Sequence, residues 1–288
     1  MAVSGKTKVY GVIGDPIEHS LSPVMQNAAF AYSKLDCIFL AFNVRSPDLG
    51  KAMDGVRALG IQGLNVTMPH KTAVLGFLDE VDPTVKALKA VNTIKNENGK
   101  LFGFNTDGVG ALSALRENGV EPKGKKIMLL GAGGAARAVA FALAEHAAEI
   151  SILNRSIVPA AQLADLVKET FDSKVFAYAL SPLTVKGNLV DANLLINATS
   201  VGMKPKDFET LVAPRWLKPD LAVMDIVYNP IETKLAKNAK AAGAKVVSGV
   251  EMLIYQGAAS FEIWTGAKAP VEVMREAALS HLRKVQKI

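Results

Sequence analysis

The sequence predicts an α/β protein with two domains, of which the second is a doubly wound dinucleotide-binding domain. Its 288 residues suit one large or two medium domains. Short apolar runs alternate with amphipathic stretches, which is typical of an α/β layer structure. A glycine-rich segment at residues 129–136, between an apolar run and a long helical pattern, indicates the dinucleotide-binding domain.

The N-terminal part alternates strand and helix patterns. Ser22-Pro23 and Asp82-Pro83 each have the pattern of an N-cap residue followed by proline at the first helical position. Turn residues at 96–99 separate two apolar runs, which predicts a hairpin. We expect strands at 8–14, 37–44 and 61–66, helices after Ser22, at 47–59 and after Asp82, and hairpin strands at 91–95 and 100–105.

The C-terminal part repeats the alternation at a longer spacing. A helix begins near residue 106, and a basic loop at 123–126 leads into the glycine-rich segment. Strands followed by helices at this spacing predict a parallel sheet with right-handed crossovers. The last helices, from Gly249 onward, could belong to either part. The expected strands of this part begin at residue 126 and then lie at 149–155, 193–197, 222–226 and 245–247.

The glycine-rich segment reads LLGAGGAA and matches the dinucleotide fingerprint G-x-G-x-x-G/A. Gly131 would make the tight turn, Gly133 would let the backbone approach the pyrophosphate, and Ala136 would allow the helix to pack closely on the strand. The N-terminus of that helix would meet the negative charge. An ordinary glycine-rich turn is the alternative, but the preceding strand and following helix favour the fingerprint.

The next strand end predicts which nucleotide binds. A site for NAD expects an acidic residue about 20 residues after the fingerprint, whereas this chain has Asn154-Arg155-Ser156 there. Arg155 and Ser156 are hydrogen-bond donors that suit a 2′-phosphate, which favours NADP. Farther along, Asn197 and Thr199 would line the crevice at the carboxyl ends of the strands.

Candidates for proton transfer lie at strand ends and helix starts. The segment LNVTMPHKT, residues 64–72, ends a strand and contains Lys71, and Asp107 begins a later helix. Hydroxyl and amide side chains with one lysine and one aspartate suit a polyhydroxylated substrate, with the lysine as general acid or base. The candidates of the N-terminal part are Ser20, Ser22, Asn65, Thr67, Lys71, Asn92 and Asp107.

Several of these residues could instead have a purely structural role. Lys71 could be a solvated lysine in a turn, and Asp107 could be an acidic residue that favours the helix dipole. His70 is a rival proton carrier, although adjacent residues in a turn point apart. We expect Cys37 to be a buried, inert thiol, and Met252 and Trp264 to be core residues on sequence pattern alone.

Composition and charge exclude several classes. The net charge is +6, but the lysines are scattered, and the densest basic stretch, 281–287, resembles the solvated face of a final helix. We therefore expect no nucleic-acid binding. A single cysteine fits a reducing compartment. The N-terminus has no signal-peptide pattern, and no apolar run reaches the ~18 residues of a membrane helix. We expect a cytoplasmic protein with no membrane segment and no metal site.

Eight segments in the right order resemble the shikimate dehydrogenase family. The resemblance covers essentially the whole chain and implies reduction of 3-dehydroshikimate to shikimate with NADPH. It also implies that the C-terminal helices return to the first domain, so we place the substrate domain at 1–106, the NADP domain at 107–248 and the returning helices at 249–288. The segments are GDPIEHSLSP, GLNVTMPHK, AVNTI, FNTDGVG, GAGGAARA, NATSVGM, DIVYNP and GVEMLIYQGAASFEIWTG.

The resemblance also implies roles for individual residues. Lys71 and Asp107 correspond to the catalytic pair, and Ser20 and Ser22 to the serines that hold the substrate carboxylate, with Tyr228 nearby. The implied contacts to ring hydroxyls are Asn65, Thr67, Asn92 and Gln256. The implied cofactor contacts are Gly131, Ala132, Gly133, Gly134, Ala135, Asn154, Arg155, Ser156 and Thr199, with Ile226, Gly249 and Met252 as walls of the nicotinamide site.

One position departs from the family pattern. Many NADP-using members have a second basic residue four positions after the arginine, and this chain has Pro159 there. The preference for NADP over NAD therefore stays open, as does use of quinate, which differs from shikimate by a hydroxyl at C1. A non-catalytic dinucleotide sensor on the same fold is a third possibility, which Lys71 and Asp107 disfavour. We expect a monomer or homodimer.

Overall fold

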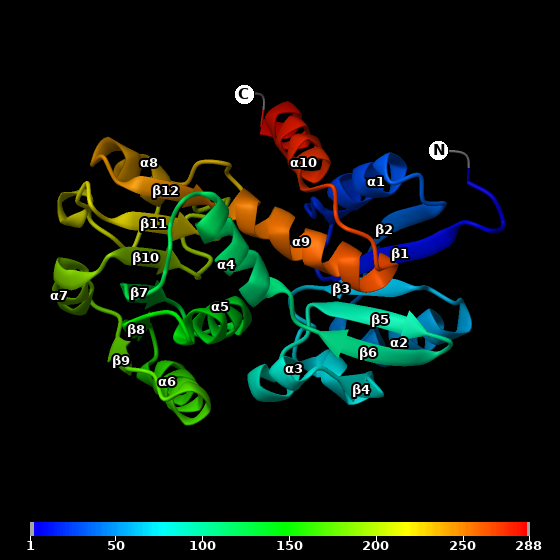
Figure 1. Ribbon diagram of the computed structural model, residues 1–288, viewed down its shortest axis with the longest axis horizontal. Helices are drawn as coiled ribbons and strands as arrows, with labels where there is room; N and C mark the ends of the chain where they lie inside the picture. The colour runs from blue at the N-terminus through cyan, green and yellow to red at the C-terminus, as the bar shows by residue number, and fades with distance from the viewer. Residues whose placement is uncertain (1–2, 287–288) are drawn as a thin grey trace. The chain divides into compact units, whose positions relative to one another are not determined.

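The computed structural model describes residues 3–286 and divides the chain into two compact units. The first unit contains residues 1–106 and 254–288, and the second contains residues 107–253. Each unit has one six-stranded sheet (Figure 1). The ends of the expected substrate domain and C-terminal segment, including Lys287 of the basic stretch, lie outside the described residues.

The sheet of the first unit is mixed. Its strand order is β2-β1-β3-β5-β6-β4, with β1 parallel to β2 and β3 and with β5 antiparallel to β3 and β6. The hairpin turns at Asn98 and Gly99, where both φ angles are positive (55° and 89°), as a two-residue turn requires. The strands are β1 (Lys8–Gly14), β2 (Cys37–Asn43), β3 (Gly63–Val66), β4 (Glu80–Val81), β5 (Thr93–Glu97) and β6 (Lys100–Phe104).

Helices from both ends of the chain cover this sheet. Helices α1 (Ser22–Tyr32) and α10 (Val271–Gln286) pack side by side in Figure 1. Phe261 of α9 (Gly249–Thr265) stacks on Phe30, and Trp264 stacks on Tyr10 and Phe39. These aromatic contacts join residues 254–288 to the first unit. The remaining helices are η1 (Ser46–Asp48), α2 (Leu49–Ala58), η2 (Ala73–Phe77) and α3 (Pro83–Leu88).

The predicted N-cap at Ser22 is wrong, whereas the one at Asp82 is confirmed. The N–H of Met25 donates to the carbonyl of Leu21 (3.1 Å), so Leu21 is the N-cap and Ser22 is the first helical residue. No side chain caps this helix. The carboxylate of Asp82 accepts from the N–H of Thr84 at 2.8 Å.

The sheet of the second unit is entirely parallel. Its order is β12-β11-β10-β7-β8-β9, which is the doubly wound order with its switch point between β7 and β10. This arrangement confirms the predicted fold class. The strands are β7 (Lys126–Leu130), β8 (Glu149–Asn154), β9 (Val175–Ala179), β10 (Leu194–Asn197), β11 (Ala222–Asp225) and β12 (Lys245–Ser248).

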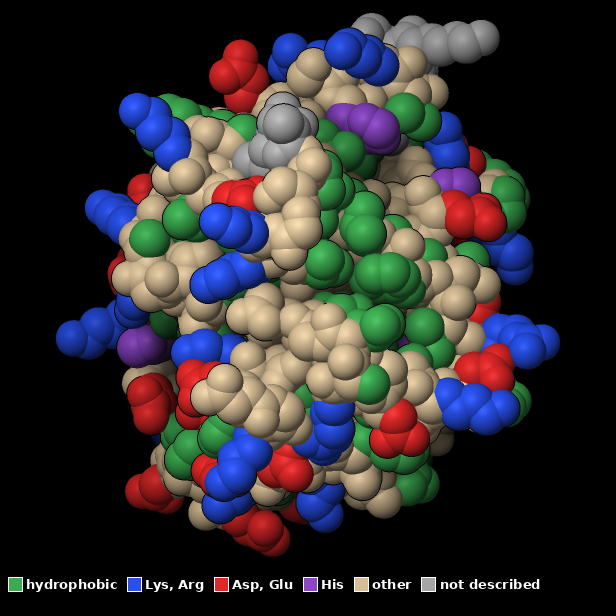
Figure 2. Space-filling model, turned by 90° about the vertical axis from the view of Figure 1, so that its right-hand side faces the viewer, with side chains coloured by type: hydrophobic (Ala, Val, Ile, Leu, Met, Phe, Trp, Pro, Cys, Tyr) green, Lys and Arg blue, Asp and Glu red, His purple; other side chains and the backbone are tan. Residues whose placement is uncertain are grey.

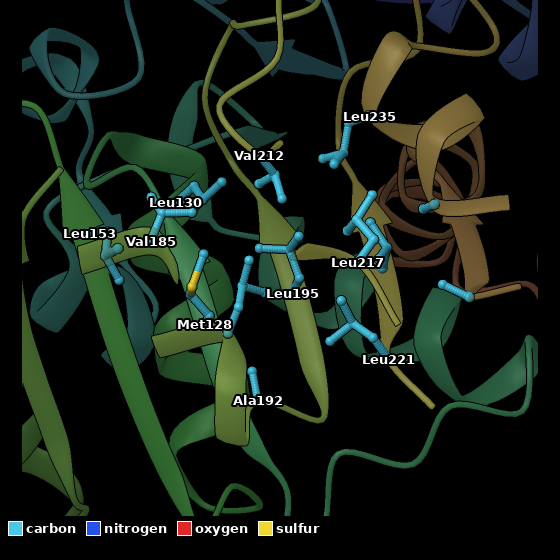
Figure 3. Close-up of a cluster of buried hydrophobic side chains, with 14 residues drawn as sticks. Met128, Leu130, Leu153, Val185, Ala192, Leu195, Val212, Leu217, Leu221 and Leu235 are labelled. Atoms are coloured by element: carbon cyan, nitrogen blue, oxygen red, sulfur yellow. The ribbon is translucent and has the colours of Figure 1, made fainter. Parts of the chain in front are cut away.

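A hydrophobic core fills one face of this second sheet. Met128 and Leu195 of neighbouring strands belong to one cluster of buried side chains with Val185, Val212 and Leu235 (Figure 3). The core fixes the strand ends from which the cofactor-site loops leave. The helices of this unit are α4 (Asp107–Glu117), α5 (Gly134–Ala144), α6 (Ile157–Phe171), α7 (Pro182–Asp191), η3 (Pro214–Trp216) and α8 (Lys234–Ala241), followed by the start of α9.

The structure bears on three exclusions expected from the sequence: nucleic-acid binding, a membrane segment and a metal site. On the face shown in Figure 2, Lys and Arg side chains are interspersed with Asp and Glu and form no basic stripe. Within residues 3–286, no helix is long and apolar enough to cross a membrane. The same residues contain no group of three or more His, Cys, Asp or Glu side chains placed to hold a metal ion.

Candidate active site

The end of β3 turns sharply at the segment that contains Lys71. The N–H of Thr67 donates to Ile13 (3.0 Å), and the N–H of His70 donates back to Thr67 (2.9 Å), which closes a turn. Lys71 is half-buried in this turn, and its carbonyl accepts from the N–H of Val91 (2.8 Å). Backbone bonds to two other strand ends therefore fix the position from which the Lys71 side chain starts.

His70 is a structural residue in this turn. Its ring is 1% exposed, and its Nε2 lies 2.6 Å from the carbonyl oxygen of Val44, which can only accept. Nε2 therefore carries a proton that is committed to the backbone. This arrangement argues against His70 as the proton carrier and leaves Lys71 as the candidate.

Six polar side chains of the first unit form one buried hydrogen-bond network. None of them is more than 8% exposed. These six side chains are amides and hydroxyls, so they carry no charge and can offer both donors and acceptors to a hydroxylated ligand. Its members are Asn65 from β3, Asn92 and Thr93 at the start of β5, Thr106 after β6, and Gln256 and Ser260 from α9.

Asn92 connects the strands to α9. Its Oδ1 accepts from the N–H of Thr106 (2.8 Å), and its Nδ2 donates to the hydroxyl of Thr106 (2.9 Å) and to Oε1 of Gln256 (3.2 Å). The amide of Asn92 is therefore fixed in one orientation. The structure thus brings together three of the predicted substrate residues, Asn65, Asn92 and Gln256.

The two predicted carboxylate-binding serines lie at the start of α1. The N–H of Ser22 donates to the hydroxyl oxygen of Ser20 at 3.3 Å. Ser22 is 6% exposed, and because Leu21 rather than Ser22 is the N-cap, its hydroxyl makes no capping bond. A hydroxyl that is not used for capping can serve a ligand.

The second unit begins at Asp107, the first residue of α4. Asp107 is 5% exposed. A Cβ atom at the next position, Gly108, would lie 2.7 Å from the carbonyl oxygen of Ala138, so α4 packs against α5 with backbone contact. Tight packing of α4 holds the Asp107 carboxyl group in a defined place at the helix start.

The fingerprint turn has the geometry that a dinucleotide needs. Gly131 has φ +106°, and a Cβ there would lie 2.8 Å from the carbonyl oxygen of Ala198. Gly133 is the exposed N-cap of α5, and a Cβ there would meet no protein atom within 4 Å. The uncapped N–H groups of the first helical turn are therefore open to an anion, which fits a pyrophosphate. Ala132, Gly134 and Ala135 are half-buried beside it, and Ala136 is fully buried.

The end of β8 fits a 2′-phosphate. Arg155 is exposed, and within the described chain its guanidinium has no ion-pair partner. The side-chain Nδ2 of Asn154 donates to the carbonyl of Ser156 (2.9 Å), which shapes the loop, and the Ser156 hydroxyl makes no capping bond to α6. Pro159 lies exposed in the first turn of α6, so it supplies no second cation.

The ends of β10 and β11 share a buried polar cluster. Oδ1 of Asn197 accepts from the hydroxyl of Thr199 (2.7 Å), and Nδ2 of Asn197 donates to Asp225 (2.9 Å). Asp225 also accepts from the hydroxyl of Thr233 (2.6 Å) and the N–H of Val227 (3.1 Å). Burial raises the pKa of Asp225 to about 6, although these three hydrogen bonds lower it.

The expected nicotinamide walls lie at the same strand ends. Gly249 is buried, and a Cβ there would clash with the carbonyl group of Ile226, so only glycine lets α9 start this close to β11. Met252 is 6% exposed, and Ile226 and Tyr228 are half-buried. Burial raises the pKa of the Tyr228 phenol, so this group is a neutral donor.

Sequence patterns missed three members of the buried network. Thr93 and Thr106 each follow an asparagine at a strand end, in VNTI and FNTD, and this repeated Asn-Thr pair was an available signal. Ser260 lies one helical turn after Gln256 and thus on the same face of α9. Cys37 and Trp264, which the sequence predicted to lie in the core, are 5% and 7% exposed. Both are therefore core residues.

Three family models match the chain. The model of the shikimate dehydrogenase substrate binding domain matches residues 12–94. The model of shikimate/quinate 5-dehydrogenase matches residues 114–245, and that of the shikimate 5′-dehydrogenase C-terminal domain matches residues 249–279. Together the three matches extend from the first sheet to the last helix.

Full-length relatives agree with these matches. A shikimate dehydrogenase (NADP(+)) from Methanopyrus kandleri is 51% identical over 286 residues, with 98% of this chain and 99% of the relative covered. A crystal structure of a shikimate dehydrogenase in complex with NADP+ has a TM-score of 0.91 at 45% identity and covers 98% of both chains. A shikimate 5-dehydrogenase from Listeria monocytogenes, in complex with shikimate and NAD, has a TM-score of 0.90 at 38% identity and covers 96% of this chain and 98% of its own.

Proposed function

The chain belongs to the shikimate dehydrogenase family, and we propose that it catalyses the reversible, NADPH-dependent reduction of 3-dehydroshikimate to shikimate. The observation that carries the proposal is the fingerprint turn in a doubly wound sheet whose second strand is followed by exposed Arg155 rather than by an acid. The uncharged buried network of the first unit supports a hydroxylated substrate.

We propose Lys71 as the proton carrier and Asp107 as its carboxylate partner. Bound NADPH would supply a hydride to the C3 carbonyl carbon. The ammonium group of Lys71 would give a proton to the carbonyl oxygen, so that the ketone becomes an alcohol without build-up of negative charge. The buried carboxyl group of Asp107 would orient the Lys71 ammonium group and a substrate hydroxyl by accepting hydrogen bonds.

The proposed substrate contacts follow the chemistry of the ligand. Ser20, Ser22 and the neutral phenol of Tyr228 would donate to the substrate carboxylate, because each offers an O–H group. Asn65, Thr67, Asn92 and Gln256 would bind the ring hydroxyls, since amides and hydroxyls can pair with an O–H group as donor or acceptor.

The proposed cofactor contacts are the fingerprint turn for the pyrophosphate and the end of β8 for the 2′-phosphate. Arg155 would pair with the phosphate, and Asn154 and Ser156 would shape and complete that loop. Thr199, Ile226, Gly249 and Met252 would border the nicotinamide. Because Pro159 offers no second cation, Arg155 alone would set the preference for NADP, and some use of NAD is the second candidate activity.

The proposal also covers the location of the protein in the cell, its oligomeric state and nucleic-acid binding. We propose that the protein works in the cytoplasm as a monomer or homodimer and binds no nucleic acid. Gel filtration with light scattering tests the oligomeric state, and titration of labelled duplex DNA at low salt tests nucleic-acid binding.

The activity is tested by following the absorbance of reduced nicotinamide with purified protein. Shikimate or quinate is offered with NADP⁺ or NAD⁺, in four separate pairs. We expect the highest kcat/KM with shikimate and NADP⁺. Comparable turnover of quinate would assign the chain to the broader shikimate/quinate activity. Dinucleotide binding without turnover of any pair would overturn the proposal and support a sensor.

A further inference from the structure

We propose that Ser260, together with Thr93, is a positioning residue that holds the Asn65 amide with its NH₂ group toward the protein and its carbonyl oxygen toward the substrate. The inference rests on the proposed function, because it assigns the orientation of a side chain that the proposal places against the ring hydroxyls. The orientation of the Asn65 amide decides which chemical group of the substrate can bind opposite it.

Ser260 is fully buried and lies at the centre of the network. Its hydroxyl hydrogen has an acceptor-only partner, the carbonyl oxygen of Gln256 one turn earlier in α9, at 3.0 Å. Once that hydrogen is used, the Ser260 oxygen is an acceptor for Nδ2 of Asn65, which lies at 3.0 Å. The hydroxyls of Thr93 (2.8 Å) and Thr106 (3.3 Å) also lie beside it, and each also donates to Oδ1 of Asn92 (3.0 and 3.2 Å).

The Asn65 amide is therefore surrounded by acceptors on one side. Its Nδ2 donates to Ser260, to the hydroxyl oxygen of Thr93 (3.2 Å) and to the carbonyl oxygen of Asn92 (3.2 Å). The carbonyl can only accept, so a flipped Asn65 would face it oxygen to oxygen. Of the three, Ser260 makes the shortest contact, and its helix back-bond makes it an acceptor.

The opposite end of the same amide is its side-chain oxygen, Oδ1. Oδ1 of Asn65 is buried and accepts no hydrogen bond within the described residues, although the residue is only 5% exposed. A buried carbonyl oxygen without a donor is costly, and proteins keep such groups where a ligand or water supplies the donor. We assign that donor to a substrate hydroxyl.

The orientation has a consequence for specificity. A carbonyl oxygen has no hydrogen to give, so it pairs with a hydroxyl and repels a ketone or ether oxygen at the same place. A reversed amide would prefer the ketone or ether. The network thus selects ring substrates that carry a free hydroxyl opposite Asn65, and it does so through a residue of α9 that needs no contact with the substrate.

The first test is Ser260→Ala, which removes one acceptor and leaves two longer ones. We expect KM for shikimate to rise about fivefold to tenfold, with kcat and KM for NADP⁺ nearly unchanged. Thr265→Ala is the matched control, because the Thr265 hydroxyl makes the same kind of back-bond on α9, to Phe261 at 2.8 Å, outside the network. Its kinetic constants should stay at the wild-type values.

The second test is a double-mutant cycle with Asn65→Ala. If Ser260 acts through Asn65, Ser260→Ala should raise KM for shikimate in the wild-type background and have little further effect once Asn65 is alanine. Equal effects in both backgrounds would overturn the inference, because they would show that Ser260 acts independently of Asn65.

A third pair of variants keeps the test informative if Ser260→Ala folds poorly. Thr93→Val removes the hydroxyl at nearly constant shape and should raise KM for shikimate, whereas Thr93→Ser retains it and should restore the wild-type value. Equal KM values for the two variants would contradict the inference. Failure of the proposed function is distinguishable, because wild-type protein would then turn over no shikimate at all.

Discussion

The two units of the molecule prepare their ligand sites in opposite ways. In the first unit, six buried side chains bond to one another, and the side-chain oxygen of Asn65 accepts no hydrogen bond from the described residues. In the second unit, the fingerprint turn has almost no side chain, and Gly133 faces open space. The first site is made of side-chain amides and hydroxyls, and the second of backbone N–H groups.

The two kinds of site match the chemistry of the two ligands. A ring with several hydroxyls is recognised by the direction of each donor and acceptor, and buried networks hold those directions. A pyrophosphate is a diffuse negative charge, and a helix N-terminus with close backbone approach satisfies it. Substitutions in the first unit should therefore alter substrate constants through side-chain chemistry, whereas those in the second should act through space and charge.

The largest expected effect comes from Lys71→Ala in the first unit. Loss of a general acid or base typically costs about 10²-fold to 10⁴-fold in rate, so kcat should fall by that factor while the Kd for shikimate changes little. Steady-state kinetics and calorimetric titration of shikimate measure the two quantities. The exposed Lys51 of α2 serves as a control in Lys51→Ala. A kcat within about threefold of wild type would remove Lys71 from the chemistry.

Titration of Asp225 in the second unit should make the stability of the protein depend strongly on pH. Because burial raises its pKa to about 6, the folded protein holds this proton more tightly than the unfolded chain does. The stabilising contribution is present below about pH 4 and is lost as pH rises through about 6, with a total of about 3 kcal/mol.

This pH dependence is measured by urea unfolding at several pH values between about 4 and 7. The free energy of unfolding of wild type, relative to Asp225→Asn, should decline over this window. Asp191→Asn, at a side chain that is 72% exposed, is the control and should show no such trend. A constant difference between wild type and Asp225→Asn would show that the pKa is not raised.

Arg155→Ala tests whether charge, rather than the direction of hydrogen bonds, determines ligand binding in the second unit. Loss of a charge-assisted hydrogen bond should raise KM for NADP⁺ about 10-fold to 100-fold. KM for NAD⁺ and for shikimate should stay unchanged, because neither ligand has the 2′-phosphate. An equal rise for both dinucleotides would show that Arg155 does not read the phosphate.

The smallest expected effect is a difference in stability between alanine variants of two glycines in the same turn. Gly131→Ala forces a left-handed φ and a close contact with Ala198, and should cost about 1–2 kcal/mol of stability. Gly133→Ala has no protein atom to meet and should leave the Tm of the ligand-free protein unchanged while raising KM for NADP⁺. Differential scanning fluorimetry with and without NADP⁺ measures both. Equal losses of Tm in the two variants would contradict the open space at Gly133.

Local patterns were enough to predict most of the fold. The strand at Lys8–Gly14 and the cap at Asp82 depend on neighbouring residues, so a local pattern contains the necessary information. The cap at Ser22 was wrong because the chain bends into the helix one residue earlier, at Leu21. Strand β9 was not predicted, since it is a short edge strand with Phe176 43% exposed.

The buried network was harder to predict than the fingerprint. The glycine spacing of the turn lies within eight residues of sequence, whereas Asn65 and Ser260 are 195 residues apart and meet only because the part of α9 from Ile254 onward belongs to the first unit. The boundary between the two compact units falls after Leu253, inside α9. A single sequence offers no signal for a contact between residues so far apart along the chain.

The most direct measurement follows the hydride itself. NADPH that carries deuterium on the transferred position of its nicotinamide is incubated with 3-dehydroshikimate and the protein, and the product is examined by NMR. We expect shikimate with deuterium bound to C3 and none elsewhere, and no labelled product in a parallel reaction without protein. Unlabelled product, or no product from an intact protein that still binds NADPH, would contradict this expectation.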